Sequence, residues 1–256
     1  MNFNNKVVLI TGASSGIGAD CAITFAKYSA ALSLVGRNAH NLAKVAHECE
    51  KLNNTKPLII TADITSDEDI KRIVDETIQK YGKIDVLVNN AGINPISANH
   101  ATEDFDRVVA TNLRGTYVLT KYVIPQLIKT KGNVIVVSSI LSQKPLPIMT
   151  PYCMTKAALD MFTKCTALQL GPKGVRINSV NPGPMKTELF KRGGMSEEDS
   201  AKMFAGIEIN TPLKKITKGE DVAELVTFLA SDKASCITGS CHVIDCGLML
   251  GEAGDL

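Results

Sequence analysis

The sequence lacks the features that mark disulfide-rich, zinc-binding and membrane-spanning proteins. Its seven cysteines form an odd, scattered set without CxxC spacing, which argues against a disulfide framework and against zinc. No apolar run approaches the roughly 18 residues that a transmembrane helix needs. We therefore expect reduced cysteines, no metal site and no membrane partner.

Charge excess and targeting signals are also absent. A net charge of +2 gives no electrostatic case for binding nucleic acid or a membrane surface. The start, MNFNNKVVLI, has no small-residue cleavage site, and the end, GEAGDL, is neither a peroxisomal nor an ER address. We expect a cytoplasmic protein whose partners are small molecules.

What is present is a regular alternation of short apolar runs with longer segments of helical period. At 256 residues, with 45% hydrophobic and 21% charged residues, the chain fits one soluble domain spanning 1–256. The apolar runs are at 6–11, 31–36, 57–62, 84–89, 133–138, 175–180 and 241–245. Such runs, separated by helices, predict a doubly wound α/β domain with a parallel sheet of about seven strands.

One segment, approximately 184–216, departs from this rhythm. It combines Gly-Gly, charged residues and scattered Met, Phe and Ile. Such a composition is typical of a mobile lid over a site, and an ordinary surface insertion would look similar. We predict a helical substrate lid here because of the motif that precedes it.

The first apolar run leads into TGASSGIG, residues 11–18, and then into a helical segment. Glycines in a turn between a strand and a helix let the backbone approach a pyrophosphate, and the following helix N-terminus supplies N–H groups. Gly12, Gly16 and Gly18 are therefore predicted to bind a dinucleotide. The spacing TGxxxGxG differs from the GxGxxG of two-domain dehydrogenases.

A second motif, PYCMTK at 151–156, places a tyrosine and a lysine four positions apart. Proline is tolerated in the first turn of a helix, so Tyr152 and Lys156 would share one helical face. A nearby cation favours the phenolate, and we therefore expect Lys156 to lower the pKa of Tyr152 from about 10. The alternative is a solvated helix face without chemistry.

Taken together, the motifs resemble the short-chain dehydrogenase/reductase family. TGxxxGIG at 11–18, NNAG at 89–92, a serine thirteen positions before the tyrosine, YxxxK at 152–156 and NPGPMKT at 181–187 follow the family's order and spacing. The resemblance covers nearly the whole chain and is to the single-domain branch that includes 3-oxoacyl-acyl-carrier-protein reductases. It implies a Rossmann domain and assembly as a homotetramer or homodimer.

The family's catalytic tetrad falls on Asn112, Ser139, Tyr152 and Lys156. The resemblance implies that Tyr152 exchanges a proton with the carbonyl or alcohol oxygen and that Ser139 donates a hydrogen bond to it. Lys156 would favour the phenolate and hold the nicotinamide ribose, and Asn112 would anchor a water that links Lys156 to solvent. Further cofactor contacts implied by the resemblance are Gly12, Ser14, Ser15, Gly16, Ile17, Gly18, Asp63, Ile64, Asn89, Ala91, Gly92, Tyr152, Lys156, Pro182, Gly183 and Thr187.

The residues at the end of the second apolar run bear on the preference for NAD(H) or NADP(H). NAD-preferring folds place an acid there, whereas this chain has Gly36 followed by Arg37. Arginine offers a forked, charge-assisted contact to a 2′-phosphate, so NADP(H) is favoured over NAD(H). Two observations oppose this: Arg37 could face solvent, and Ser15 stands where many NADP-using relatives carry a basic residue.

We therefore predict an NADP(H)-preferring carbonyl reductase that acts on a small carbonyl or alcohol. Met and other apolar residues in the lid and after Ser139 favour a lipophilic substrate; these residues are Leu146, Ile148, Met149, Met185, Leu189, Phe190, Met195, Met203 and Phe204. The alternatives are an NAD-dependent alcohol dehydrogenase of the same fold and a non-catalytic nucleotide-binding regulator.

Overall fold

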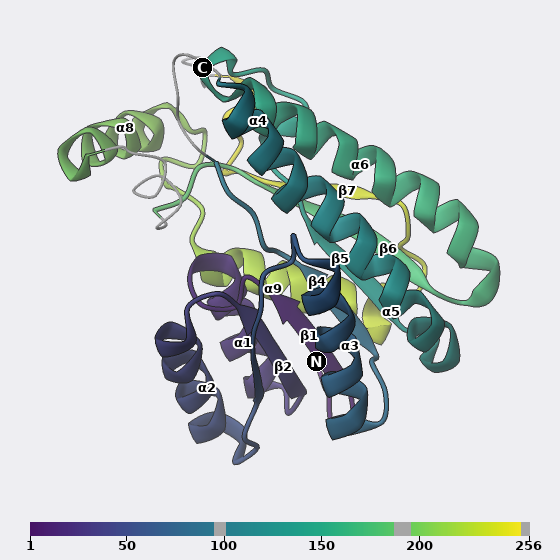
Figure 1. The fold of residues 1–256 in the computed structure, drawn as a ribbon. Coiled ribbons are helices and arrows are strands. Elements are labelled where there is room, and N and C mark those ends of the chain that lie inside the picture. Colours follow the sequence, from purple (N-terminus) through teal and green to yellow (C-terminus); the bar gives the residue numbers. More distant parts are fainter. Residues whose placement is uncertain (95–100, 187–195, 252–256) are drawn as a thin grey trace.

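The computed structural model describes residues 1–94, 101–186 and 196–251. Seven parallel strands form one sheet in the order β3-β2-β1-β4-β5-β6-β7 (Figure 1). The strands are β1 (Val7–Thr11), β2 (Ala31–Gly36), β3 (Leu58–Thr61), β4 (Val86–Asn89), β5 (Asn133–Val137), β6 (Arg176–Pro182) and β7 (Cys241–Ile244). The predicted doubly wound class and the number of strands are confirmed.

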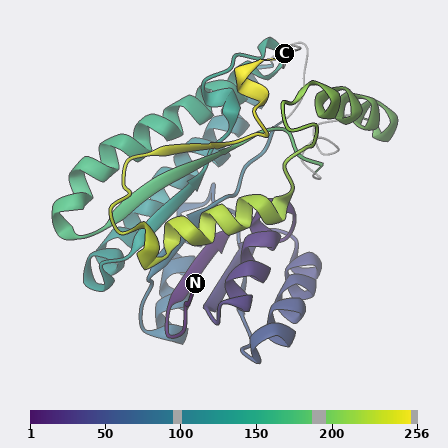
Figure 2. The same cartoon turned by 180° about the vertical axis from the view of Figure 1, so that it is seen from behind.

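Helices cover both faces of the sheet. Those described are α1 (Gly16–Lys27), α2 (Ala39–Asn53), α3 (Asp67–Tyr81), α4 (Thr102–Val108), α5 (Thr116–Thr130), α6 (Thr150–Leu170), α8 (Glu197–Asn210) and α9 (Gly219–Ala230), with a π-helix η1 (Val109–Gly115) between α4 and α5. Short 3₁₀ turns are η2 (Ile140–Ser142), η3 (Pro147–Met149), η4 (Gly171–Lys173), η5 (Asp232–Ala234) and η6 (Leu248–Leu250). Helix α9 crosses the sheet beside α1, as Figure 2 shows from behind.

Helix α8 lies apart from the helices that cover the sheet, at the end of the molecule where the strands finish (Figures 1 and 2). Ser196 begins it as an N-cap, because its hydroxyl accepts a hydrogen bond from the Asp199 N–H, and three acids follow in the first turn. The predicted lid segment therefore contains a helix. Residues 187–195 of that segment are outside the described part of the chain.

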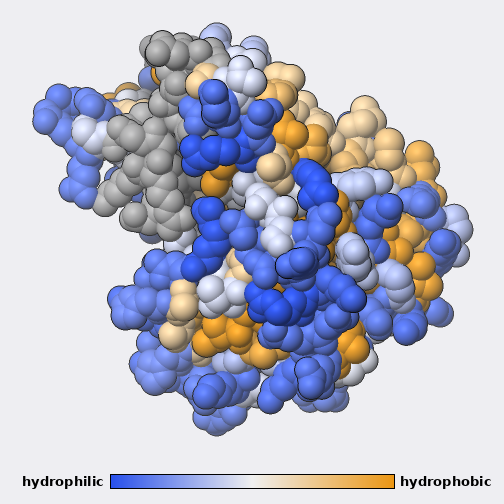
Figure 3. Space-filling model, in the orientation of Figure 1, coloured by the Kyte–Doolittle hydropathy of each residue, from blue (hydrophilic) through white to orange (hydrophobic). Residues whose placement is uncertain are grey.

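Apolar side chains are exposed on the outer side of α5 and α6. Tyr117 and Tyr122 on α5 and Met154, Met161 and Leu168 on α6 are all more than two-fifths exposed. Figure 3 shows apolar residues gathered on this side of the molecule. This surface contrasts with the hydrophilic covering over α3 in the same view.

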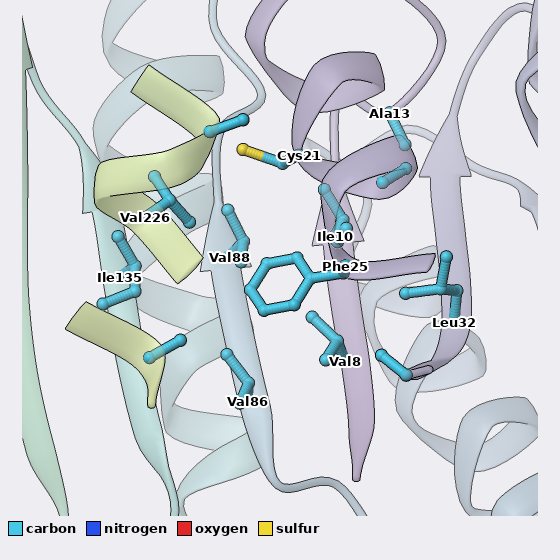
Figure 4. Close-up of a cluster of buried hydrophobic side chains, with 14 of the residues drawn as sticks. Val8, Ile10, Ala13, Cys21, Phe25, Leu32, Val86, Val88, Ile135 and Val226 are labelled. Carbon is cyan, nitrogen blue, oxygen red and sulfur yellow. The ribbon is translucent and has the colours of Figure 1, made fainter. Parts of the chain in front are cut away.

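The sheet separates two hydrophobic cores, and alternate residues of each strand point into one or the other. In β1, Val8 and Ile10 belong to the core under α1 and α9, whereas Leu9 belongs to the core under α3, α5 and α6. Phe25 of α1 fills the first core among Val8 and Val88 (Figure 4). Because both faces are buried, the strands are almost continuously apolar, which is the pattern that predicted them.

No helix in the described part of the chain is long and apolar enough to cross a membrane.

The sheet's strand order reverses between β1 and β4, so the loops that follow these two strands diverge to opposite faces. A crevice at this point is where open α/β sheets bind ligands. The candidate site lies there.

Candidate active site

A cavity of about 480 Å³ opens at the carboxyl ends of the strands. Its walls come from the segments that follow β1 to β6, so residues far apart in sequence meet because parallel strands finish at one edge. Most of the predicted cofactor and catalytic residues line it, namely Gly12, Ser14, Ser15, Gly16, Ile17, Arg37, Asp63, Ile64, Ala91, Gly92, Ser139, Tyr152, Lys156, Pro182 and Gly183.

Three predicted residues, Gly18, Asn89 and Asn112, are buried and do not line the cavity. Thr187 lies outside the described residues. Asn89 donates from Nδ2 to the Thr120 hydroxyl at 2.8 Å. Three of the predicted lid residues, Leu189, Phe190 and Met195, are likewise outside the described part.

The glycine loop has the backbone that a close approach requires. Gly12 and Gly16 have φ of +65° and +54°, which favour glycine. A Cβ at Gly12 would stand 2.7 Å from Asn90 Nδ2 and 2.9 Å from Ala91 Cα. The loop is thus packed directly against the segment after β4, and it leaves the first turn of α1 facing the cavity.

Thr11 and Asn90 join these two segments. The Thr11 hydroxyl accepts hydrogen bonds from the N–H groups of Asn90 and Ala91 at 3.0 and 3.1 Å. Asn90 returns the contact by donating from Nδ2 to the carbonyl oxygens of Thr11 and Gly12. The pair fixes the separation of β1 and β4 at the reversal point, where the cavity begins.

These residues fit a dinucleotide. A glycine-rich turn, the first turn of a twelve-residue helix and the ends of neighbouring parallel strands converge on one elongated cavity. At its outer end, Arg37 and Asp63 form an ion pair, with 3.6 Å between Nη1 and Oδ2. Arg37 thus lines the cavity, although its side chain is 65% exposed.

At the other end of the cavity, α6 brings Tyr152 and Lys156 together. The helix begins at Thr150 with Pro151 in its first turn, as predicted. Lys156 Nζ lies 5.2 Å from the centroid of the Tyr152 ring and donates a hydrogen bond of 2.8 Å to the Val137 carbonyl at the end of β5. The two side chains therefore share one face, which points into the cavity.

Ser139 lies near Tyr152 on the wall of the cavity, and its side chain lowers the pKa of the phenol by a small amount. Ser139 begins the short turn η2, and its Oγ accepts from the Leu141 N–H at 3.1 Å. The preceding residue, Ser138, donates to the Lys156 carbonyl at 3.2 Å. Strand β5 and helix α6 are thereby held together where the three predicted catalytic side chains meet.

Burial controls the ionisation of the pair. It raises the pKa of Tyr152 to about 12, with a smaller lowering by the hydrogen bond from Ser139, and it lowers the pKa of Lys156 to about 8. The expectation that Lys156 would lower the pKa of Tyr152 is therefore wrong for this structure. Desolvation of the phenolate outweighs the attraction of an ammonium group whose hydrogen bond goes to Val137.

Asn112 lies in the π-helix η1, a type of helix that often marks functional sites. Its Oδ1 accepts from the Ile93 N–H at 2.8 Å, and its Nδ2 donates to the Ile93 carbonyl at 2.9 Å. In the structure Asn112 therefore fixes the segment that carries Gly92 and Asn94. The water-anchoring role stays a prediction.

The inner part of the cavity is mainly apolar. Met149, Met185, Met203, Leu146 and Ile207 line it, together with Ile93, Leu141 and Asn94. Two residues predicted to line it do not: Ile148 is 42% exposed, and Phe204 is 1% exposed and does not line the cavity. Helix α8 presents Met203 and Ile207, one helical turn apart, so these two face the cavity and Phe204 faces elsewhere.

Sequence reasoning missed Asp160 and Asn181. Asp160 follows Lys156 by one turn of α6, and both of its carboxylate oxygens accept from Asn181 Nδ2, at 2.8 and 3.1 Å. The available signal was a carboxylate four positions after a candidate catalytic lysine. Its partner on β6 becomes apparent only when the sheet is assembled.

Comparison with known proteins agrees with this geometry. A family model described as enoyl-(acyl carrier protein) reductase matches residues 12–249. The chain is 35% identical to a Thermotoga maritima protein named 3-oxoacyl-acyl-carrier-protein reductase FabG, over 98% of this chain and all of that protein. The chain belongs to the short-chain dehydrogenase/reductase family.

Two solved structures of this family differ in coenzyme. One is the L-sorbose reductase from Gluconobacter frateurii complexed with NADPH and L-sorbose, 29% identical with a TM-score of 0.89 over 97% of this chain and 98% of that one. The other is the 3-ketoacyl-(acyl-carrier-protein) reductase from Brucella melitensis complexed with NADH, 34% identical with a TM-score of 0.85 over 95% and 98%. The chain is thus a short-chain dehydrogenase/reductase-type oxidoreductase, from a family that binds nicotinamide coenzymes.

Proposed function

We propose that this protein is an NADP(H)-preferring carbonyl reductase that interconverts a carbonyl and a secondary alcohol by hydride transfer. The observation that carries the proposal is the group of Ser139, Tyr152 and Lys156, which line one cavity between the glycine loop and an apolar pocket. A carbonyl oxygen placed between the two hydroxyls would receive two hydrogen bonds. Its carbon would then face the inner end of the cleft.

In the reducing direction, Tyr152 and Ser139 act on the carbonyl oxygen. The reduced nicotinamide, when bound, supplies the hydride that adds to the carbonyl carbon. Negative charge grows on the oxygen, where the Ser139 hydroxyl stabilises it by a hydrogen bond and Tyr152 transfers its phenolic proton to complete the alcohol. A phenol with a pKa of about 12 is protonated at neutral pH and can therefore donate the proton that reduction requires.

Lys156 and Asn112 support this step. Protonated Lys156 would hold the nicotinamide ribose and help to return a proton to Tyr152, since it lies against the tyrosine ring and is almost completely buried. Asn112 would keep the Gly92 segment, one wall of the cleft, at a constant position through its two hydrogen bonds to Ile93. The roles of both residues are proposals.

Coenzyme selection rests on Arg37. Its guanidinium stands at the outer end of the cleft beyond β2, where it would meet a 2′-phosphate, and no acid occupies that strand end. Asp63, 3.6 Å away, shares the charge of Arg37 and would face the adenine. Two observations support the NAD-dependent alternative: the charge of Arg37 is already paired with Asp63, and one relative was solved with NADH.

The apolar inner pocket supports a lipophilic substrate. Methionines from three segments, Met149, Met185 and Met203, line it and would adapt to varied shapes. Helix α8 would act as the lid, because it contributes Met203 and Ile207 while standing apart from the sheet. Closing it would exclude water from the reacting carbonyl.

We propose a homotetramer or homodimer located in the cytoplasm. The exposed apolar side of α5 and α6 supports the assembly, since such surfaces commonly mark contacts between proteins. All seven cysteines are free, which is consistent with a reducing compartment. Sedimentation of the purified protein would distinguish these assemblies from a monomer.

Turnover by wild type and by Tyr152→Phe tests the reaction. Oxidation of NADPH and NADH would be followed against diketones, 3-oxoacyl esters, ketosteroids and retinal. We expect wild-type turnover, and we expect Tyr152→Phe to lose about 10²- to 10⁴-fold in kcat because the proton donor is gone. Coenzyme affinity should be unchanged. If both proteins bind coenzyme and neither reduces any carbonyl, the non-catalytic alternative is favoured instead.

Arg37→Ala tests coenzyme selection. Loss of a charge-assisted contact should lower kcat/KM for NADPH by about tenfold to 100-fold and leave the value for NADH within about threefold. Lys51→Ala, at an exposed ion pair on the same side of the sheet, is the control. Equal losses with both coenzymes, or a wild-type preference for NADH, would contradict the assignment of Arg37.

A further inference from the structure

Asp160 is a buried carboxylate beside the proposed active site with no role in the reaction described above. It is 7% exposed and lies on α6 four positions after Lys156, so the two residues occupy the same face one turn apart. A buried carboxylate is costly unless it has hydrogen-bond donors or a compensating charge. Its surroundings supply both.

The hydrogen-bond donors come from β6. Asn181 Nδ2 lies 2.8 and 3.1 Å from the two carboxylate oxygens, and the Ser179 hydroxyl donates to one of them at 3.4 Å. Asn181 Oδ1 lies closer to the Ser179 hydroxyl, at 2.9 Å, so the single serine proton is shared between the amide and the carboxylate. Asp160 and Ser179 together therefore orient the Asn181 side chain.

Asn181 passes this constraint to the catalytic serine. Its Nδ2 also contacts the carbonyl oxygen of Ser139 at 3.2 Å and the hydroxyl of Ser142 at 3.0 Å. These residues begin and end the turn η2, which sets the position of the Ser139 hydroxyl relative to Tyr152. Asp160 is thus connected to the position of Ser139 through one intermediate side chain.

The compensating charge comes from Lys156. Within the described part of the chain, Asp160 forms no ion pair within 4.0 Å. Its negative charge acts over a longer distance on Lys156, which lies one helical turn away. That charge raises the pKa of Lys156 and opposes the larger lowering that burial causes. Removing the charge of Asp160 would leave nothing to oppose the lowering of the Lys156 pKa by burial.

The other ionisable groups around Asp160 are few. Tyr152 and Lys164 share its helix, and the charges of Asp160 and Lys164 act on Cys241 of β7, whose pKa is raised mainly by burial. The groups of β6 that contact Asp160, the Ser179 hydroxyl and the Asn181 amide, are neutral. Lys156 is therefore the group in the site whose ionisation depends most directly on Asp160.

We propose that Asp160 is a positioning residue for the proposed reduction. Through Asn181 it fixes the turn that carries Ser139, and through its charge it keeps the ammonium group of Lys156 protonated at neutral pH. The inference rests on the proposed function for its catalytic consequence, although its electrostatic part can be measured without turnover.

The pH dependence of Asp160→Asn tests the proposal, because the variant keeps the size of the side chain and removes its charge. Reduction needs protonated Lys156, so wild-type kcat should fall as the pH rises past about 8. In the variant we expect that fall to begin at a lower pH, which makes the loss of kcat relative to wild type greater at the alkaline end than at the acidic end. A profile that is lowered evenly at every pH would overturn the charge role.

Thr163→Val is the matched control, since Thr163 is also buried on α6 and, among the described residues, its hydroxyl bonds only to the Leu159 carbonyl of the same helix. Its pH profile should match the wild type. Should Asp160→Asn fail to fold, Asp160→Ser, which leaves room for water, is expected to show the same displacement. An unmoved profile in Asp160→Ser would overturn the proposal equally.

A second measurement separates this inference from the proposed function. The affinity for NADPH, followed by coenzyme fluorescence, should weaken as Lys156 loses its proton, and in Asp160→Asn this weakening should occur at a lower pH than in wild type. If wild type reduces no carbonyl but the pH at which NADPH affinity weakens is lower in Asp160→Asn than in wild type, the proposed function fails and the role of Asp160 stands. Weakening at the same pH in both proteins would contradict the role of Asp160.

Discussion

Lys156 and Tyr152 are each pushed toward their neutral form by the same burial. The pKa of Lys156 falls to about 8 while that of Tyr152 rises to about 12, so at neutral pH the site holds a protonated amine beside a neutral phenol. This combination can donate a proton twice in succession, from Tyr152 and then from Lys156. Sequence spacing alone predicted the contact but gave the wrong direction for Tyr152, because spacing does not reveal how completely a pair is desolvated.

Lys156→Met is expected to stabilise the fold and to abolish turnover. The lowered pKa of Lys156 corresponds to a cost of about 3 kcal/mol for keeping it charged. Losing its charge-assisted hydrogen bond to Val137 offsets about 2 kcal/mol, so we expect a net gain of about 1 kcal/mol near neutral pH. Urea unfolding with activity assays on the same samples checks this.

The gain in stability that we expect for Lys156→Met should depend on pH. The folded protein binds the Lys156 proton more weakly than the unfolded chain, so the cost is fully present below a pH of about 8 and disappears as the pH rises to 10.5. The advantage of Lys156→Met should therefore shrink over that interval. A variant that is less stable at neutral pH, or an advantage that is constant with pH, would contradict this account.

At the scale of elements, the loops that follow the strands carry the residues of the site. Close packing at glycines holds these loops in position. The strands and α6 could be predicted because apolar periodicity and Pro151 are local signals. The π-helix η1 and the Asp160–Asn181 contact could not be predicted, since both depend on elements that meet only after folding. The interior of the lid was predicted only in part, because Met203 faces the cavity whereas its neighbour Phe204 does not.

Gly115→Ala tests how η1 supports the cleft. A Cβ at Gly115 would lie 2.7 Å from the carbonyl oxygen of Ile64, so η1 must move away from the segment that carries Asp63. We expect a loss of about 1 to 3 kcal/mol in the free energy of unfolding and weaker coenzyme binding. Thermal unfolding with and without NADPH measures both quantities.

The control for this change is Gly171→Ala, because a Cβ at Gly171 meets nothing within 4 Å. It should leave stability within about 0.5 kcal/mol and coenzyme affinity unchanged. If Gly115→Ala behaved like Gly171→Ala, the contact between η1 and Ile64 would not be needed to hold the cleft.

At the scale of the whole molecule, the parallel sheet places every component of the proposed reaction at one edge. The glycine loop, Arg37 and the group of Ser139, Tyr152 and Lys156 follow different strands but line one cavity. Family membership confirms the fold and the class of oxidoreductase. The proposed carbonyl reduction joins these parts, since it needs a hydride source, a proton donor and an apolar substrate pocket in contact.

The most direct test follows the transferred hydrogen. With NADPH deuterated at the reactive carbon of the nicotinamide, mass spectrometry of the alcohol product from wild type should show one deuterium on the new carbinol carbon, and Tyr152→Phe should form almost no labelled product. The absence of deuterium transfer to every carbonyl in the panel, from a protein that binds the coenzyme tightly, would contradict the central claim that this site performs hydride transfer.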